Sequence, residues 1–410
     1  MSTPKLDLEF TRAQFPAFAE NSLKGQAFFE NAGGSYTSRH VIDRLLRFYK
    51  ERKVQPYAPY QASTLGGAEM DAARDRLAAL MGVQSDQLSF GPSTSQNTYV
   101  LAQAFREILS AGDAIIVTNQ DHEANSGVWR RLDSAGIEIR EWKMDPATGH
   151  LPLEALDHWL DGKVKLVCFP HCSNIVGEIN DVAAITKRAR DAGAFTCVDG
   201  VSYAPHGFPN IGDLGADAYL FSSYKTYGPH QGIMVLSDRL NAALPNQAHF
   251  FNSESSYKRF TPAGPDHAQI AACAGMADYI DALYAHHFGD DADAPERNTA
   301  IHDLMRAAEI ENLQPVLDML SAKNSVRLLG PIEAAVKAPT VAVVTKEDPE
   351  SLAAELSNHG IMCGGGDFYA VRCIEGQGEE SKKGVLRLSF VHYTSKEEID
   401  QLLSALDQVL

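Results

Sequence analysis

An aspartate and a lysine each end a strand-like run near the middle of the chain, and together they can hold an aromatic cofactor. Asp199 ends the apolar run AFTCVDG, and Lys225 ends the next run, AYLFSSYK. A carboxylate buried at a strand end is costly unless it meets a cation. The protonated ring nitrogen of pyridoxal phosphate (PLP) is such a cation, and a lysine on the same rim can bind the cofactor's aldehyde as a Schiff base. We therefore predict a PLP site held by these two residues.

Hydroxyl side chains supply donors for the cofactor's phosphate. Ser93, Thr94 and Ser95 stand just before an amphipathic pattern, NTYVLAQAF. A phosphate at that helix start would meet free backbone N–H groups and the positive end of the helix dipole. Ser222, on the strand that leads to Lys225, adds another donor. A plain N-cap explains the three residues equally well when they are taken alone, but their place beside the aspartate and lysine favours the phosphate.

Three more polar residues are candidates for work on a substrate. His122 follows the run AIIVTNQ, and its imidazole could stack on the cofactor ring and shuttle protons. Asn174 follows VCFPHCS and offers an amide to a substrate carboxylate or to the cofactor's phenolic oxygen. Arg387 is the cation of the strand VLRLSF, where a guanidinium suggests a bidentate grip on an α-carboxylate. A polar loop histidine and a strand-edge salt bridge are the competing interpretations.

The elements that must position these residues follow an α/β pattern. Short β-rich runs alternate with helical patterns, which indicates a mainly parallel sheet with helices on both faces and its ligand at the carboxyl ends of the strands. The predicted strands cover residues 114–120, 137–144, 164–170, 194–200, 218–224 and 232–237. Long helical material and a compact α+β unit follow residue 290, with a glycine-rich turn at Gly364–Gly366. We predict an N-terminal segment (1–30) beside the small domain, a large cofactor-binding α/β domain (31–290), and a smaller C-terminal α+β domain (291–410).

Composition narrows the class of protein. The chain has 410 residues, of which 44% are hydrophobic, and a formal net charge of −17, which opposes binding to nucleic acid or anionic membranes. No targeting segment and no apolar run of about 20 residues is present, so we expect a cytoplasmic protein. The six cysteines form no CxxC pair, so we expect reduced thiols and no metal site. A nicotinamide dehydrogenase is rejected because no GxGxxG opens a helix.

At the level of motifs, the chain resembles the class V aminotransferase superfamily of PLP enzymes, in the branch of cysteine desulfurases, selenocysteine lyases and isopenicillin N epimerase-like proteins. The resemblance implies the large PLP-dependent transferase-like domain, and a homodimer with active sites at the subunit interface. It assigns cofactor contacts to Lys225, Asp199, His122, Thr94, Ser95, Ser222 and Ser202, and substrate contacts to Asn174, Arg387, Asn31 and Tyr369. The matching segments are FFENAGGSYTS, DHEANSGVW, HCSNIVGEIND, FTCVDGVSYAPH, LFSSYKTYGPHQG and LRLSFVHYTSKEEID.

The sequence departs from this branch in the loop before Arg387. Desulfurases carry a nucleophilic cysteine there, and the nearest alignment places Tyr369 at its position. Cys373 lies four residues later and Cys363 six residues earlier, so only a loop rearrangement would present a thiol. Ser202 also replaces the glutamine or histidine often found near the cofactor oxygen. The chain therefore resembles a desulfurase-like subgroup that lacks the usual catalytic cysteine.

Three functions fit these residues. The favoured one is a PLP-dependent lyase that acts on a small amino acid by β-elimination, with a C–S bond as the natural candidate. Lys225 would remove the α-proton, Asp199 would hold the ring nitrogen protonated, and His122 or Tyr369 would protonate the leaving group. An aminotransferase or an amino-acid racemase/epimerase uses the same carbanion and the same residues. A non-catalytic binding protein on a PLP fold is the third interpretation.

Overall fold

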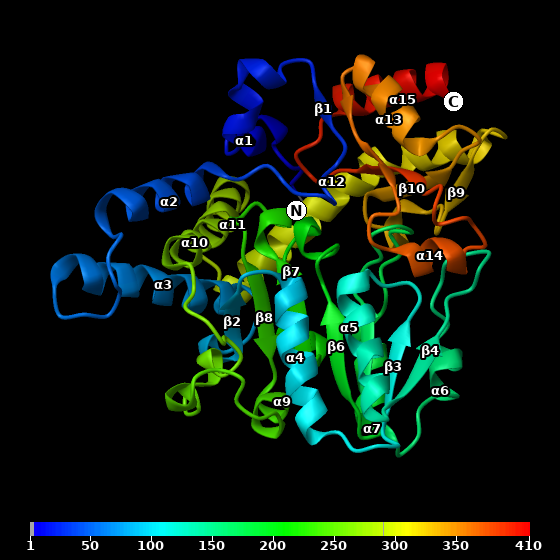
Figure 1. Cartoon of the computed structure of the whole chain (residues 1–410). Helices are drawn as coiled ribbons and strands as arrows, with labels where there is room; N and C mark the ends of the chain where they lie inside the picture. The colour runs from blue at the N-terminus through cyan, green and yellow to red at the C-terminus, as the bar shows by residue number, and fades with distance from the viewer. Residues whose placement is uncertain (1–3, 290) are drawn as a thin grey trace.

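A seven-stranded sheet forms the centre of the larger unit in the computed structural model, which describes residues 4–289 and 291–410 (Figure 1). Five neighbouring strands run parallel, while β8 is antiparallel to both of its neighbours, so the sheet is mixed but mostly parallel. The order across the sheet is β2 (Leu88–Gly91), β8 (Gly232–Leu236), β7 (Ala218–Ser222), β6 (Phe195–Asp199), β5 (Val164–Pro170), β3 (Ala114–Thr118) and β4 (Glu138–Trp142). This confirms the predicted α/β class.

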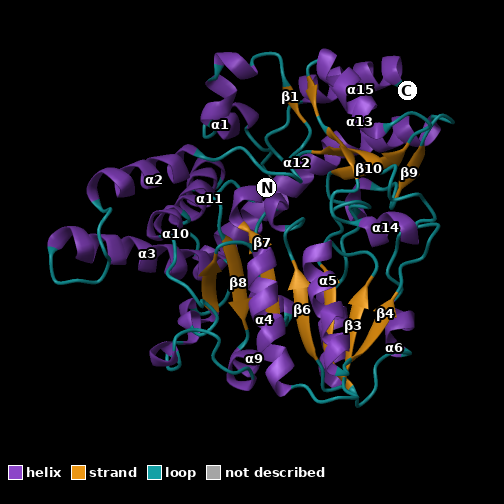
Figure 2. Cartoon of the chain, in the orientation of Figure 1, coloured by secondary structure: helices purple, strands orange, loops and turns teal. Residues whose placement is uncertain are grey.

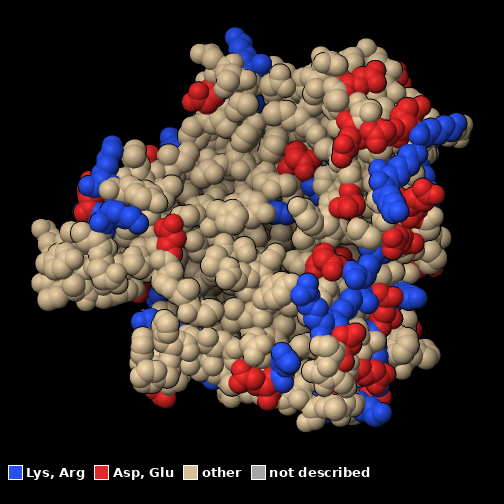
Figure 3. Space-filling model, viewed as in Figure 1, with Lys and Arg blue, Asp and Glu red and all other residues tan. Residues whose placement is uncertain are grey.

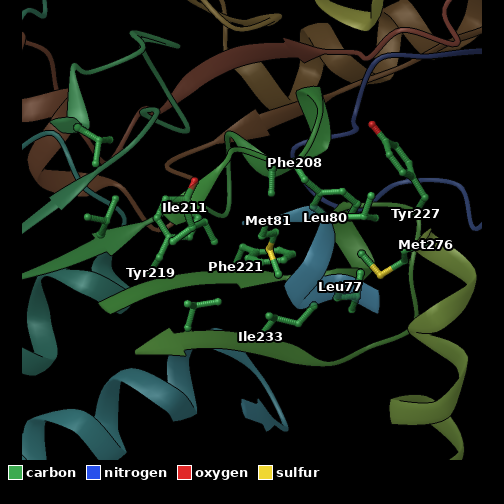
Figure 4. Packing of buried hydrophobic residues seen from close by; sticks show 14 of the residues in the cluster. Leu77, Leu80, Met81, Phe208, Ile211, Tyr219, Phe221, Tyr227, Ile233 and Met276 are labelled. Atoms are coloured by element: carbon green, nitrogen blue, oxygen red, sulfur yellow. The ribbon is translucent and has the colours of Figure 1, made fainter. Parts of the chain in front are cut away.

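Alternating side chains bury both faces of this sheet, because successive residues of a strand point to opposite sides. On β7, Leu220 packs into the core under α4 (Thr94–Ile108) and α5 (Gly127–Arg130). Its neighbours Tyr219 and Phe221 pack into the opposite core, with Leu77 and Met81 at the end of α3 (Gln61–Leu80) (Figure 4). Helices therefore cover both faces of the sheet (Figure 2), and the strands are rigid supports for whatever their ends carry.

A smaller antiparallel sheet lies above the carboxyl edge of the large one (Figure 1). Its order is β12 (Gly364–Gly366), β13 (Val385–Ser389), β10 (Thr340–Val344) and β9 (Arg327–Leu329). The helices α12 (Ala294–Ala322), α13 (Pro349–Asn358) and α15 (Lys396–Val409) pack around it. β1 (Ala27–Phe28) pairs in parallel with β11 (Ile361–Met362), so the N-terminal segment joins this smaller unit. The predicted divisions at residues 30 and 290 stay a prediction.

One local prediction was wrong, and several boundaries were too generous. Gly364–Gly366 is not a turn: it pairs with β13 as strand β12, because backbone hydrogen bonds hold an edge strand that has no side chains to reveal it. Strand predictions such as 137–144 and 218–224 end earlier in the structure, at Trp142 and Ser222. The helical apolar pattern LEALDHWL likewise forms a helix only as far as Asp157. In each case the apolar pattern continues past the point where backbone pairing ends.

The remaining helices complete the covering layers. The helices α2 (Arg39–Glu51) and α3 form an arm that projects from the large unit, and α10 (His267–Ala272) and α11 (Ala274–His287) pack against its base (Figure 1). None of the helices that the structure describes is long and apolar enough to cross a membrane. The other α-helices are α1 (Leu8–Arg12), α6 (Leu153–Asp157), α7 (Val182–Asp191), α8 (Ile211–Leu214), α9 (Asp238–Ala243) and α14 (Val371–Gly376).

Candidate functional site

Two connected hollows lie where the carboxyl ends of the parallel strands meet the small unit. The inner pocket is bounded by the ends of β3, β5, β6 and β7 and by the start of α4. The outer cavity has a volume of about 450 Å³ and adds residues from the small unit and from the segment after β1. The two hollows share Ser95, His122, Asn174, Tyr224 and Lys225. Ten of the eleven predicted site residues line one or both hollows, and Asn31 is the exception.

Asp199 and Lys225 face the inner pocket from neighbouring strand ends. Asp199 is the last residue of β6, and Lys225 ends the short turn after β7. The pKa of Lys225 is lowered to about 8, mainly by burial and then by the charge of Arg387, while the charges of Asp199 and Glu30 oppose the shift. Burial also raises the pKa of Asp199 to about 6, against the hydrogen bond that its Oδ1 accepts from the Val201 N–H at 2.8 Å. A cationic ring nitrogen beside Asp199 would relieve the cost of this buried charge.

Asp121 is a second buried carboxyl of the inner pocket, and sequence reasoning missed it. Its oxygens accept hydrogen bonds from the His122 backbone N–H at 2.9 Å and from Asn125 Nδ2 at 2.8 Å. Burial and the nearby charge of Asp199 hold its pKa well above the usual range. Its position directly before His122, beyond the end of β3, was the signal available in the sequence.

Hydroxyl groups and a helix start form the other end of the inner pocket. The hydroxyls of Thr94 and Ser222 lie 2.8 Å apart, and Thr94 is the first residue of the 15-residue helix α4. Ser93 is the N-cap of that helix, since its hydroxyl accepts a hydrogen bond from the Gln96 N–H at 3.2 Å. Ser93 therefore serves as the cap, while Thr94, Ser95 and Ser222 line the pocket. Ser202, at the Asp199 end, lines it too.

His122 lies between the two hollows in a neutral form. Its Nδ1 accepts a hydrogen bond from the Ala124 N–H at 3.0 Å, which leaves the ring proton on Nε2. Burial lowers the pKa of His122 to about 4, and the charges of Lys225 and Arg387 act in the same direction. At neutral pH the ring therefore offers an N–H donor for a hydrogen bond. Because it is not an imidazolium, it does not act as an acid.

Arg387 is buried in the outer cavity on an interior strand, between β12 and β10. Its Nη2 pairs with Glu30 Oε1 at 2.7 Å, and its guanidinium lies 3.7 Å from the centre of the Phe368 ring. Its Nη1 donates to the Asn174 carbonyl at 3.3 Å. The salt bridge considered from the sequence is thus present, but it lies inside the cavity and not at a strand edge.

A strained loop closes the cavity above Arg387. Phe368 and Tyr369 both have left-handed backbone angles, with φ of 49° and 57°, which side chains rarely adopt. Asn174 Nδ2 donates to the Phe368 carbonyl at 3.0 Å, and the Glu123 N–H donates to the Tyr369 carbonyl at 2.8 Å. These bonds fix the loop to the large unit, while the Tyr369 side chain stays 73% exposed at the cavity mouth.

Glu30 takes the place in the cavity that the sequence interpretation gave to its neighbour Asn31. The Asn31 side chain is buried, and its Oδ1 accepts a hydrogen bond from the Tyr393 hydroxyl at 2.6 Å. It is not among the residues that line either hollow, whereas Glu30, Ala32 and Gly33 line the outer cavity. An acidic residue next to the apolar run AFF was the signal that pointed to Glu30.

The loop cysteines lie away from the cavity. Cys373 is buried on α14 with its sulfur 3.8 Å from the Ser173 hydroxyl, and burial raises its pKa to about 12. Burial also raises the pKa of Cys363 to about 12, and the charge of Glu30 adds to this. Neither residue lines either hollow. A thiol with so high a pKa is a poor nucleophile at neutral pH.

Comparisons with known proteins find others of similar sequence and fold. The family model described as Aminotransferase class-V matches residues 27–261. The chain is 33% identical to the "Aminotransferase-like protein FGM3" of Gibberella zeae, with 100% of each chain covered, and 27% identical to a "Cysteine desulfurase" of Serratia proteamaculans, with 98% of each covered. Among solved structures it is similar to the apo cysteine desulfurase of Thermococcus onnurineus, with a TM-score of 0.84 and 22% identity over 100% of this chain and 99% of that one.

Proposed function

Because the chain belongs to the class-V aminotransferase family, as its motifs predicted, we propose that it is a PLP-dependent lyase acting on an amino acid by β-elimination. The observation that carries the proposal is the convergence of Asp199, Lys225 and the Thr94–Ser222 hydroxyl pair on one inner pocket. That pocket opens into a cavity that holds Arg387. Cofactor and amino acid would thus meet at Lys225, which borders both hollows.

The residues of the inner pocket fit the cofactor's three polar ends. Thr94, Ser95 and Ser222 would hold the phosphate at the start of α4, where the helix dipole favours an anion. Asp199 would hold the ring nitrogen, and a buried carboxylate without that cation would be costly. Lys225 would bind the aldehyde. When bound, the cofactor stores the electron pair that is left at the substrate's α-carbon.

The chain's own residues would then direct the proton transfers. The Lys225 amine, with its pKa of about 8, would take the α-proton at near-neutral pH. Arg387 would orient the α-carboxylate, and Asn174 would support it from the rim. As the bond from Cβ to sulfur breaks, its electron pair leaves with the sulfur, which the Tyr369 hydroxyl at the cavity mouth would protonate. His122 would position the ring as a neutral group.

A desulfurase reaction is disfavoured, although relatives carry that name. It needs a nucleophilic cysteine beside the substrate, whereas Cys373 is buried on α14 and Cys363 lies outside the cavity lining. A β-elimination needs no such thiol. Aminotransfer is the second candidate, because the relative at 33% identity over the full chain is named aminotransferase-like.

Product analysis tests the proposal. The protein loaded with PLP is incubated with a panel of cysteine S-conjugates and common amino acids. Release of pyruvate, ammonia and a thiol without a keto-acid acceptor supports the lyase. Turnover that depends on an acceptor supports aminotransfer, and solvent deuterium uptake with inversion supports an epimerase. If no amino acid changes the cofactor's absorbance, the chain is a binding protein and the proposal fails.

We also propose that the protein works as a homodimer. The α2–α3 arm carries exposed apolar side chains at its tip, and no Lys, Arg, Asp or Glu is visible there in Figure 3. Phe250 and Phe251 are 85% and 69% exposed, and their loop borders a groove shared with Tyr57 of the arm. Exposed apolar side chains on neighbouring segments are typical of an interface. Sedimentation of the wild type against Phe250→Glu would show a dimer that the substitution weakens.

A further inference from the structure

Glu30 is an acidic residue in a cavity that otherwise suits an amino acid's carboxylate. Its side chain is 29% exposed and sits between two glycines. A Cβ at Gly33 would lie 2.8 Å from its Oε1, and a Cβ at Gly364 would lie 3.0 Å from its Oε2. A Cβ at either position would require the Glu30 carboxylate to shift, so the two glycines leave the space that this carboxylate occupies here.

Glu30 satisfies Arg387 with only one of its two oxygens. Oε1 pairs with Arg387 Nη2, while Oε2 is buried and has no hydrogen-bond partner among the described residues. Arg387 Nε is likewise buried and unpartnered. Each partner of this ion pair thus keeps one unused hydrogen-bonding atom, which is buried in this structure and becomes available to a ligand only when the side chains shift.

Binding an α-carboxylate at Arg387 changes the balance of charge. One guanidinium would then face two carboxylates, that of Glu30 and that of the substrate. Lys225 is committed to the cofactor in the proposed function, so it does not correct this excess. An uncompensated charge in a partly buried site is costly. A second cation is needed, and the substrate itself is the group that can bring it.

The cavity walls suit such a cation. Tyr224, Phe368 and Tyr369 line the same cavity as Glu30, and aromatic faces attract an ammonium or guanidinium group. The volume of about 450 Å³ leaves room for a side chain longer than that of cysteine. Carboxylate, aromatic wall and space therefore lie together beside Arg387.

We propose that the substrate is an amino acid whose side chain ends in a cationic group, which Glu30 binds while Arg387 binds the α-carboxylate. This inference rests on the proposed function and specifies its substrate class. The cation of the substrate then balances the second carboxylate that the substrate itself brings to Arg387. A neutral amino acid of the same length leaves two carboxylates to share the one Arg387 guanidinium.

Two cysteine conjugates of nearly equal size test the proposal with the PLP-loaded protein. S-(2-aminoethyl)-L-cysteine has a distal ammonium group, and S-propyl-L-cysteine has a methyl group in its place. Each takes up one water and yields pyruvate, ammonia and its thiol when the C–S bond breaks. We expect kcat/KM for the cationic conjugate to be higher by at least about tenfold, the typical effect of one charge-assisted contact. Equal values would overturn the inference and leave the lyase intact.

Binding without turnover gives an independent readout. L-lysine and L-2-aminoheptanoate have the same chain length and no leaving group, and each is titrated against the cofactor's absorbance. Lysine should bind at least about tenfold more tightly. If both bind equally, the inference fails; if neither changes the absorbance and no conjugate reacts, the proposed function itself fails.

Variants of Glu30 tie the preference to one side chain. Glu30→Gln should remove the preference for the cationic conjugate, while Glu30→Asp should keep it at reduced affinity. Glu123→Gln is the matched control, because that carboxylate pairs with Arg372 outside the cavity lining. Thermal unfolding monitors the fold of each variant. A preference that survives Glu30→Gln in a folded protein assigns the cation to another site and overturns the proposal.

Discussion

The inner pocket and the outer cavity are built in different ways. Asp199, Thr94 and Ser222 stand at the ends of regular strands and at the start of a helix, so the sheet fixes their positions. The outer cavity takes Glu30 from the segment after β1 and Phe368 from a strained loop. Regular strands and a helix thus hold the inner pocket, where the cofactor would react. Loops hold the outer cavity, which would select the substrate.

This difference implies that substitutions in the inner pocket abolish the chemistry, whereas substitutions in the outer cavity change which substrate is accepted. The largest effect is expected at Lys225. Lys225→Ala removes the amine that binds the aldehyde, so both the imine absorbance and all turnover should disappear. Absorbance spectra after addition of PLP check this. An imine band in the variant would mean that another amine holds the cofactor.

Asp199 should give the second largest effect. Asp199→Ala leaves a protonated ring nitrogen without its partner, and the loss of one buried electrostatic contact in an active site costs about 10²–10³-fold in kcat. Asp199→Glu keeps the charge and should cost clearly less. Steady-state kinetics of both variants decide the matter, and equal losses would argue against a ring-nitrogen role.

The success of prediction from the sequence follows the same division between the inner pocket and the outer cavity. Asp199, Lys225 and Thr94 could be placed because strand ends and helix starts are visible in apolar periodicity. Glu30 was missed, and Asn31 was given its place, because nothing local says which of two adjacent side chains of a short edge segment faces a cavity made with a distant strand. The strand Gly364–Gly366 was not predicted for a similar reason. It pairs with the distant strand β13, and three glycines have no side chains whose alternation could reveal a strand.

Arg387 should affect substrate binding more than turnover. Arg387→Gln removes the fork that orients the α-carboxylate, and we expect KM to rise about 100-fold, as for the loss of a strong charge-assisted contact of about 3 kcal/mol. Arg387→Lys keeps the charge without the fork and should lie between. Comparison of kcat and KM checks the prediction, which is contradicted if kcat alone falls.

The pH dependence of cofactor capture should report the burial of Lys225. Only the free amine attacks the aldehyde, and with a pKa of about 8 its population rises about 50-fold between pH 6 and pH 8 before levelling off. An ordinary lysine would keep gaining free amine up to about pH 10. Stopped-flow rates of imine formation measure this. In Arg387→Gln the plateau should move to higher pH, because a like charge that lowers the pKa of Lys225 has been removed.

The smallest effect is expected at Cys373, and it separates elimination from desulfuration. With a pKa of about 12, the thiol is ionised in only about one molecule in 10⁵ at pH 7, and its sulfur faces Ser173 and not the cavity. Cys373→Ser should therefore keep kcat within about twofold, with a modest fall in the unfolding temperature because a hydroxyl replaces a buried thiol. Cys363→Ser serves as the matched control. A complete loss of activity in a folded Cys373→Ser protein would mean that α14 moves to present the thiol, and the outer region would then supply a reacting group in addition to selecting the substrate.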